Sequence, residues 1–234
     1  MIEKILPDAV ACAEAFDDPP DAVLHPQEEV VISRAVEKRR REFRTVRHCA
    51  RQALGELGFP PVAVLPGQHR EPLWPLGVVG SMTHCAGYRA AVVAHSRELL
   101  TVGIDAEPHQ PLPPGVLEAI ALADERVHIS ELAAANGALH WDRILFCAKE
   151  TVYKAWFPLM QRWLGFHDAT VTVETTAMIP TSVDSIEGTF SARLLVHAPT
   201  GPDPALTGFD GRWLVDDSLV ITTIAVPTPI RAMP

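Results

Sequence analysis

The sequence has no apolar run that approaches the about 18–20 consecutive residues a membrane-spanning helix needs. Its first residues, MIEKILPDAVACAEAF, contain acids where a secretory signal peptide has basic and purely apolar regions. There are only four cysteines, and they lie too far apart for a disulfide scaffold or a zinc knuckle: Cys12, Cys49, Cys85 and Cys147. These absences predict a soluble, cytoplasmic protein.

Lysine is scarce and positive charge is in deficit. The 234 residues carry 20 Lys and Arg against 29 Asp and Glu, a net charge of −9, which argues against general nucleic-acid binding. Only four of the basic residues are lysines, and two of them, Lys149 and Lys154, lie within six residues. Hydrophobic residues at 47% and charged residues at 21% indicate a globular chain, long enough for one large domain or two small ones.

The pattern along the chain predicts an α+β fold in two halves. The segment before Pro26 is rich in Pro and Asp and reads as irregular. Helices are expected from Pro26 to Gly58 and over 140–157, the second ended by Pro158, with an interrupted helical stretch over 116–137. Strands are expected over 77–84, 89–95 and 99–107, and again after residue 168, including a hairpin around 216–218. The proline-rich stretch 108–115 divides the chain into 1–108 and 109–234.

Two carboxylates end the strand expected over 99–107. Residues two apart share one face of a strand, so Asp105 and Glu107 point the same way. Converging carboxylates repel each other unless a cation joins them, and hard oxygen ligands favour Mg²⁺ or Mn²⁺. An ordinary acidic loop entry before Pro108 explains the same pattern, and both interpretations stay open.

The helix expected over 140–157 has Glu150 and Lys154 one turn apart, opposite its apolar face. The order Glu then Lys at this spacing is that of a solvated ion pair. Phe146, Tyr153 and Phe157 flank the two charges, which is unusual for a solvated face. A half-buried pair would serve as base and acid, so a catalytic role is the second interpretation.

The first helix is rich in arginine. By its periodicity, Arg39 falls inside the apolar arc with Phe43 and Val46, where a bound phosphate would explain a charge. A snorkelling side chain or a break in the helix near residue 42 explains it equally.

A glycine-bounded turn, GSMTHCAGY, presents hydroxyls and His84. Such a turn binds a phosphate or holds a nucleophile, although its glycines do not match the hydrolase elbow.

Three segments in this order, GSMTHCAGYRAA, VGIDAEP and FCAKETVYKAW, resemble the successive motifs of the 4′-phosphopantetheinyl transferases. The resemblance is to the larger, monomeric type that activates siderophore, surfactin and polyketide synthetases, and most of all to actinobacterial members. It extends over about residues 37–226 and includes KRRREFRTVRHCARQALGELG, HWDRILF and RWLGF.

The family resemblance implies a fold of two similar halves related by a pseudo-twofold, with coenzyme A as co-substrate in the cleft between them. It implies Mg²⁺, or Mn²⁺, held by Asp105, Glu107 and Glu150. The implied reaction moves 4′-phosphopantetheine onto a serine of an apo acyl or peptidyl carrier protein and releases adenosine 3′,5′-bisphosphate. The implied partners are carrier domains of fatty-acid, polyketide or nonribosomal peptide synthases, without nucleic acid or membrane, and the enzyme is expected to be a monomer.

The resemblance also implies residue roles. Glu150 is the expected base, and Lys154 the expected cation at the leaving group. Coenzyme A contacts are expected from Arg39, Arg47, Arg70, Thr83, His84 and Lys149, with His69 sharing the neighbourhood of Arg70. Tyr153 and Trp163 are expected to line the pantetheine channel, and no role is assigned to residues 124–138.

Two other functions are compatible with some of these residues. A cysteine or serine acyltransferase or hydrolase would use His84 with Cys85 or Cys147, and would be inactivated by thiol alkylation but not by chelation. A non-catalytic coenzyme A-binding protein would have no need of Asp105, Glu107, Glu150 and Lys154 together.

Overall fold

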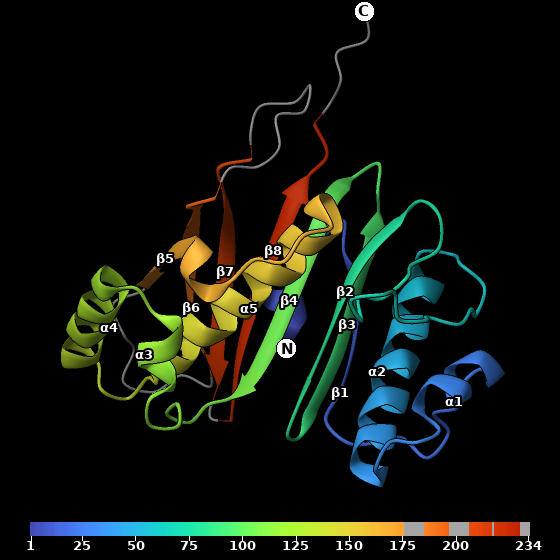
Figure 1. Cartoon of the computed structure of the whole chain (residues 1–234). Coiled ribbons are helices and arrows are strands. Elements are labelled where there is room, and N and C mark those ends of the chain that lie inside the picture. Colours follow the sequence, from blue (N-terminus) through green and yellow to red (C-terminus); the bar gives the residue numbers. More distant parts are fainter. Residues whose placement is uncertain (176–184, 197–205, 217, 230–234) are drawn as a thin grey trace, which may run out of the picture. The chain divides into compact units, whose positions relative to one another are not determined.

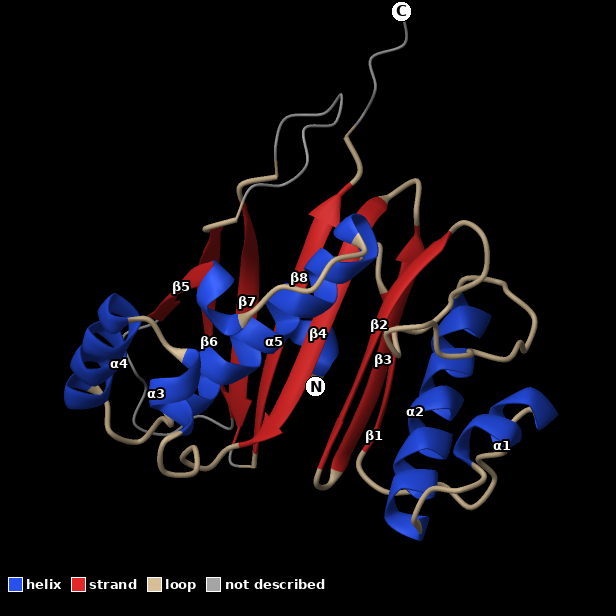
Figure 2. Cartoon of the chain, viewed as in Figure 1, coloured by secondary structure: helices blue, strands red, loops and turns tan. Residues whose placement is uncertain are grey.

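The computed structural model describes residues 1–175, 185–196, 206–216 and 218–229 (Figure 1). The chain forms two compact units: Met1–Ile104 with Ala225–Pro234, and Asp105–Ile224. The expected α+β class is confirmed, because each unit combines a 20-residue helix with a β-sheet (Figure 2). The chain changes unit inside a strand at residue 104, whereas the sequence suggested the proline-rich stretch after residue 108, and the C-terminal end joins the first unit.

The first unit contains a three-stranded antiparallel sheet in the order β1-β3-β2. Its elements are η1 (Ile2–Ile5), β1 (Ala11–Ala15), α1 (Pro26–Ile32), α2 (Glu37–Glu56), β2 (Val78–Cys85) and β3 (Tyr88–His95). The expectation that the chain is irregular before Pro26 is wrong. The prolines of this segment lie outside Ala11–Ala15, so these residues are free to pair with β3 from Ala11 opposite Val93 to Ala15 opposite Arg89.

The single helix expected from Pro26 to Gly58 is two helices. α1 ends where the Ser33 hydroxyl donates a hydrogen bond to the Val30 carbonyl at 2.9 Å, a bond that competes with the helical ladder. Val36 is extended and begins α2. Helix α2 packs on β1 and β3 (Figure 1) through a face that includes Val46, Ala50 and Leu54, all of them buried.

A buried carboxylate ties α1, α2 and the connector after α2 together. Glu28, which is 0% exposed, accepts hydrogen bonds from the Arg51 guanidinium at 3.0 Å and from the Val64 backbone N–H at 2.8 Å. Its second oxygen accepts a bond from the His25 backbone N–H at 2.9 Å, at the start of α1. Arg51 also donates to the Val23 carbonyl. The carboxylate therefore fixes where the second half of α2 can lie.

Removal of the Glu28 charge is predicted to destabilise the protein. Glu28→Gln leaves the nearly buried Arg51 cation without its counter-ion, so we expect a loss of about 3 kcal/mol in the free energy of unfolding, measured with urea. The matched control is Glu37→Gln, which breaks the exposed pair with Arg41 and is expected to cost under about 1 kcal/mol. Equal effects of the two substitutions would contradict the role assigned to Glu28.

The second unit contains most of a five-stranded sheet in the order β4-β8-β7-β6-β5. Its strands are β4 (Leu99–Pro108), β5 (Ala169–Thr175), β6 (Ser185–Leu194), β7 (Gly208–Asp216) and β8 (Leu219–Pro227), and β4 and β8 each cross the boundary between the units. Its helices are α3 (Val116–Ile120), α4 (Ala123–Ala135), α5 (Trp141–Met160) and η2 (Phe166–Asp168). The expected hairpin strands are confirmed by the antiparallel pairing of β7 and β8, and Asp217 lies outside the described residues.

Helix α5 lies across this sheet (Figure 2) and buries the apolar face expected from its periodicity. The buried side chains are Trp141, Ile144, Leu145, Ala148, Val152, Ala155 and Trp156. The expectation that Pro158 ends the helix is wrong, because a proline so close to the end removes only one hydrogen bond of the ladder. The helix ends at Met160, where Gln161 takes a left-handed conformation (φ 49°) and donates to the Phe157 carbonyl at 2.8 Å.

No helix in the described part of the chain is both long enough and apolar enough to cross a membrane.

Candidate active site

Three acidic side chains and two cations gather where β4 meets α5 in the second unit. Lys154 donates to Asp105 Oδ1 at 2.7 Å, and Arg143 donates to Glu107 Oε2 at 3.0 Å. Burial, and then the charge of Asp105, raise the pKa of Glu107 from 4.5 to about 7, while Arg143 and Lys154 act in the opposite direction. The same two causes raise the pKa of Glu150, with Lys154 opposing them. The three carboxylates predicted from sequence therefore belong to one electrostatic cluster.

The strand and the helix present these groups through simple periodicity. Asp105 and Glu107 are two apart on β4, and Glu150 and Lys154 are one turn apart on α5. Arg143 lies seven residues before Glu150 and thus on the same face of α5. The sequence analysis assigned no role to Arg143, although its spacing of seven residues from Glu150 is visible in the sequence. Within the described ranges, no three His, Cys, Asp or Glu side chains are already grouped as metal ligands.

Arg143 also holds the start of the proline-rich loop. Its Nε donates to the Gln110 carbonyl and a terminal nitrogen to the Pro111 carbonyl, each at 3.0 Å. One guanidinium thus joins Glu107 to the segment that follows β4. The fork geometry of arginine makes such a three-point contact possible, which a lysine could not reproduce.

Lys149, for which the sequence predicts a phosphate contact, is held by contacts within the second unit. Its ammonium is 2.8 Å from Glu125 Oε1 and donates to the carbonyls of Phe166 and Ala169 at 2.6 and 3.0 Å. Both charged side chains are only 2% exposed. These contacts occupy all three ammonium protons, so they speak against the expected coenzyme A phosphate contact. Glu125 was missed as well, although an acid just inside the start of a helix is a capping signal.

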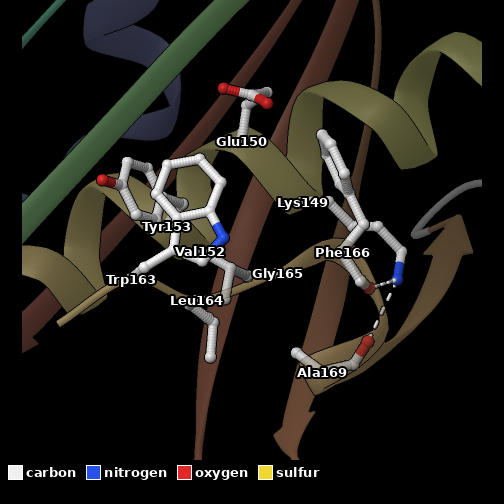
Figure 3. Close-up of a pocket in the computed structure, with 9 residues that line it drawn as sticks. All are labelled: Lys149, Glu150, Val152, Tyr153, Trp163, Leu164, Gly165, Phe166 and Ala169. Atoms are coloured by element: carbon white, nitrogen blue, oxygen red, sulfur yellow. Dashed lines mark hydrogen bonds between the residues drawn. The ribbon is translucent and has the colours of Figure 1, made fainter. Parts of the chain in front are cut away.

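A pocket beside Glu150 is lined by aromatic side chains (Figure 3). The rings of Tyr153 and Trp163 lie 4.8 Å apart, and Trp163 is 70% exposed. The full lining consists of Lys149, Glu150, Val152, Tyr153, Trp163, Leu164, Gly165, Phe166 and Ala169. The structure therefore brings together the two residues expected to line a channel, and places both in the same pocket as Glu150.

In the first unit, two of the residues expected to contact phosphate lie side by side. An Arg39 terminal nitrogen is 2.5 Å from His84 Nε2, although the two residues are 45 positions apart. Glu42 lies 3.9 Å from Arg39 and 3.8 Å from His84 Nδ1. Arg39 is in the first turn of α2, and its side chain is 46% exposed. A charge on the apolar side of the helix is therefore tolerated at this position, and the helix has no break near residue 42.

Arg47 is held more tightly than Arg39. Its Nε donates to the Val64 carbonyl at 3.0 Å, and its guanidinium carbon lies 3.2 Å from the centre of the Phe43 ring. The pKa of Arg47 is lowered to about 10, mainly by burial and further by the neighbouring cations Arg39 and Arg51, while the charge of Glu28 acts in the opposite direction.

The two other expected coenzyme A contacts in the first unit differ in exposure. Thr83 is buried in β2 beside His84, and Arg70 is exposed in a left-handed turn (φ 71°). The side chain of Arg70 is therefore accessible to a ligand, whereas the Thr83 side chain has little contact with solvent.

The cysteines are poorly placed for nucleophilic chemistry. Cys147 is fully buried, and burial together with Asp105 raises the pKa of its thiol well above the ordinary value. His84 and Cys85 are consecutive residues of β2, so their side chains point to opposite faces. His84 contacts Arg39 and Glu42 instead.

Comparison with known families defines the class of protein. Residues 27–94 match the model of the 4′-phosphopantetheinyl transferase N-terminal domain, and residues 101–203 match that of the 4′-phosphopantetheinyl transferase superfamily. The two matches together cover more than half of the chain and include the acids and basic residues of the candidate site. The class is thus a transferase that acts on the phosphopantetheine group.

Curated relatives agree with the family matches over nearly the whole chain. The identity is 53% to the 4′-phosphopantetheinyl transferase Npt of Nocardia iowensis, over 96% of this chain and 99% of the relative. It is 51% to PptT of Mycobacterium tuberculosis (97% and 98% covered) and 48% to Svp of Streptomyces mobaraensis (98% and 90%). The chain belongs to the 4′-phosphopantetheinyl transferase superfamily, and the expected likeness to actinobacterial members is confirmed. The predicted transferase function is also confirmed, and the cysteine or serine hydrolase alternative is not favoured.

The pKa of Glu107 leads to a pH-dependent stability. Between pH 4.5 and about 7 the folded protein keeps a proton on Glu107 that the unfolded chain releases, so this residue lowers stability as the pH rises. Glutamine does not titrate, so the free energy of unfolding of Glu107→Gln should not show this loss. In metal-free buffer, we expect the difference in the free energy of unfolding between Glu107→Gln and the unmodified protein to grow in favour of the variant as the pH rises from about 5 to about 8, measured with urea. The exposed Glu131→Gln on α4 serves as control, and a Glu107→Gln difference that stays constant with pH would contradict this assignment.

Proposed function

We propose that Glu150 and Lys154 carry out the chemistry of phosphopantetheine transfer, with Asp105 and Glu107 as partners in holding a divalent cation. The observation that carries this proposal is the cluster itself. Glu150 and Lys154 lie one turn apart on α5, and both interact with Asp105 of β4. A transferase that joins a phosphate to a hydroxyl needs a base on one side of the reacting phosphorus and a cation on the other.

The carboxylates fit a magnesium ion. Their oxygens are the hard ligands that Mg²⁺ and Mn²⁺ prefer, and they come from one strand face and one helix face. Burial, and then repulsion by Asp105, raise the pKa values of Glu107 and Glu150, and a dication held by Asp105, Glu107 and Glu150 would relieve the repulsion. When bound, the ion would neutralise the charge of the coenzyme A pyrophosphate.

Glu150 is the proposed general base. It accepts the proton of the carrier serine hydroxyl as the serine oxygen forms a bond to phosphorus. A base works best when its pKa lies near the working pH, and burial beside Asp105 raises the pKa of Glu150 in this direction.

Lys154 is the proposed cation at the leaving group. As the bond between phosphorus and the bridging oxygen breaks, negative charge develops on the released adenosine 3′,5′-bisphosphate. The ammonium of Lys154, which donates to Asp105, supplies the positive charge that stabilises this oxygen. A lysine suits the task because it is a compact charge with three donors.

Candidate contacts for coenzyme A are proposed within each unit taken by itself. The pocket of Tyr153 and Trp163 takes the pantetheine arm, because it is mostly apolar and opens beside Glu150. Arg39 and His84 take phosphate groups, supported by their direct contact and partial exposure. Thr83, Arg47 and Arg70 are proposed to assist them.

The proposed partners are apo acyl or peptidyl carrier domains of fatty-acid, polyketide or nonribosomal peptide synthases, which present the accepting serine. We further propose a monomer located in the cytoplasm. The four cysteines support a reducing compartment, since none of them forms a disulfide.

Loss of the Glu150 carboxylate is predicted to abolish transfer without unfolding the protein. For Glu150→Gln we expect kcat to fall by about 10²-fold or more, because a general base contributes at least that much. The melting temperature should stay the same or rise, since the substitution removes repulsion with Asp105. Carrier modification and thermal unfolding are measured side by side, with Glu131→Gln as control. A kcat within about threefold of the unmodified enzyme would exclude Glu150 as the base.

The metal requirement is tested by intact mass spectrometry of an apo carrier protein. Incubation with enzyme, coenzyme A and Mg²⁺ should add one phosphopantetheine group to the carrier, and EDTA should prevent the addition. Alkylation of the enzyme's thiols should leave the reaction largely intact, because Cys147 is buried and the side chains of Cys85 and His84 point to opposite faces of β2. Modification that persists in EDTA would rule out the metal proposal, while leaving the transfer reaction itself established.

A further inference from the structure

Lys149 and Glu150 are neighbours on α5 but face different surroundings. Glu150 lines the pocket with its carboxylate pointing away from the Lys149 ammonium, which points toward the segment after the helix (Figure 3). There it donates to the carbonyls of Phe166 and Ala169 at 2.6 and 3.0 Å. The fold of the second unit therefore uses a buried cation directly beside the proposed base.

Glu125 completes this arrangement from helix α4. Its Oε1 is 2.8 Å from the Lys149 ammonium and accepts a hydrogen bond from the Val171 backbone N–H at 2.7 Å. Its Oε2 accepts one from the Leu122 backbone N–H, also at 2.7 Å. One ion pair thereby connects the start of α4, the middle of α5 and the start of β5.

The segment held by this pair is a wall of the pocket. Residues 161–169 run from the end of α5 to the start of β5 and contribute Trp163, Leu164, Gly165 and Phe166 to the lining. Most of this segment is irregular, apart from the single turn of η2, so it has few backbone hydrogen bonds of its own. Its position depends on what its carbonyl groups contact.

Stability alone is a poor explanation for a buried ion pair. Two apolar side chains of similar volume stabilise a protein interior at least as well, because no charge has to be stripped of water. An ammonium, in contrast, directs its protons to particular oxygens and so defines one position for the backbone that carries them.

We propose that Lys149 and Glu125 are positioning residues that hold residues 161–169 as the wall against which the pantetheine arm of coenzyme A binds. This inference rests on the proposed function, in which the pocket receives that arm. It assigns a role to Lys149 other than phosphate binding, and a role to Glu125 in the segment for which the sequence suggested none.

The first test measures the position of the segment directly. Lys149→Met and Glu125→Gln are compared with the unmodified protein by hydrogen–deuterium exchange of backbone amides. We expect exchange in 161–169 to accelerate by about tenfold, the effect of one lost hydrogen bond to a charged group, with other regions unchanged. The matched control is Glu187→Gln, which removes the same charge from an exposed pair with Arg212 in the same unit and should change nothing in 161–169.

The second test separates positioning from general damage through two ligands. Calorimetry gives the affinity for coenzyme A and for adenosine 3′,5′-bisphosphate, which lacks the pantetheine arm. In both variants we expect coenzyme A to bind about tenfold more weakly and the bisphosphate to bind within about twofold of the unmodified protein. A purely structural role would weaken both ligands alike or neither. If the single variants do not fold, the neutral pair Lys149→Met with Glu125→Leu is measured instead.

The outcomes distinguish this inference from the proposed function. Unchanged exchange in 161–169, or faster exchange with unchanged coenzyme A affinity, overturns the positioning role. Tyr153→Ala tests the pocket independently, since it removes a lining ring and leaves the Lys149–Glu125 pair in place. If Tyr153→Ala leaves coenzyme A affinity unchanged, the assignment of the pocket fails, and hydrogen exchange still decides whether the pair positions the segment.

Discussion

The contact between Lys154 and Asp105 is the interaction around which the second unit is organised. Three carboxylates in a half-buried region repel one another, and burial adds to the cost of their charges. Lys154 and Arg143, both from α5, compensate two of them. The compensation works only if α5 lies in one position along β4, and the apolar face that packs α5 on the sheet supplies that position. The packing of the core therefore sets the position of α5, and this position in turn allows the charges of the candidate site to be compensated.

Two adjacent residues of α5, Lys149 and Glu150, have different roles. Glu150 opens to the pocket, whereas Lys149, about 100° around the helix, reaches the backbone of residues 161–169 and Glu125. A reactive group needs access to substrate, and the wall beside it needs a defined position. The first unit divides its arginines in a similar way. Arg39 is exposed beside His84, and Arg47 is packed between Phe43 and the Val64 carbonyl.

Expectations from the sequence succeeded where a local period governs the structure. The strand over 99–107 and the apolar face of α5 follow from spacings of two and of three to four residues, and both are present. Local signals misled where a neighbouring group decides the outcome. Ala11–Ala15 is a strand because β3 offers it a partner, and α1 ends at Ser33 because the hydroxyl takes a carbonyl from the ladder. The prediction of a phosphate contact for Lys149 rests on its charge alone, because its partner Glu125 lies 24 residues away on another helix.

The sequence by itself determined the family, the α+β class and the acids and lysine that share faces of β4 and α5, because motif order and periodicity are properties of the chain alone. Only the tertiary structure decided which charges meet. Arg143 with Glu107, Lys149 with Glu125 and Arg39 with His84 are pairs separated by 36, 24 and 45 positions. Nothing local in the chain specifies such partners, because each pair forms only after the packing of apolar faces has brought two elements together, and burial then makes an uncompensated charge too costly to keep.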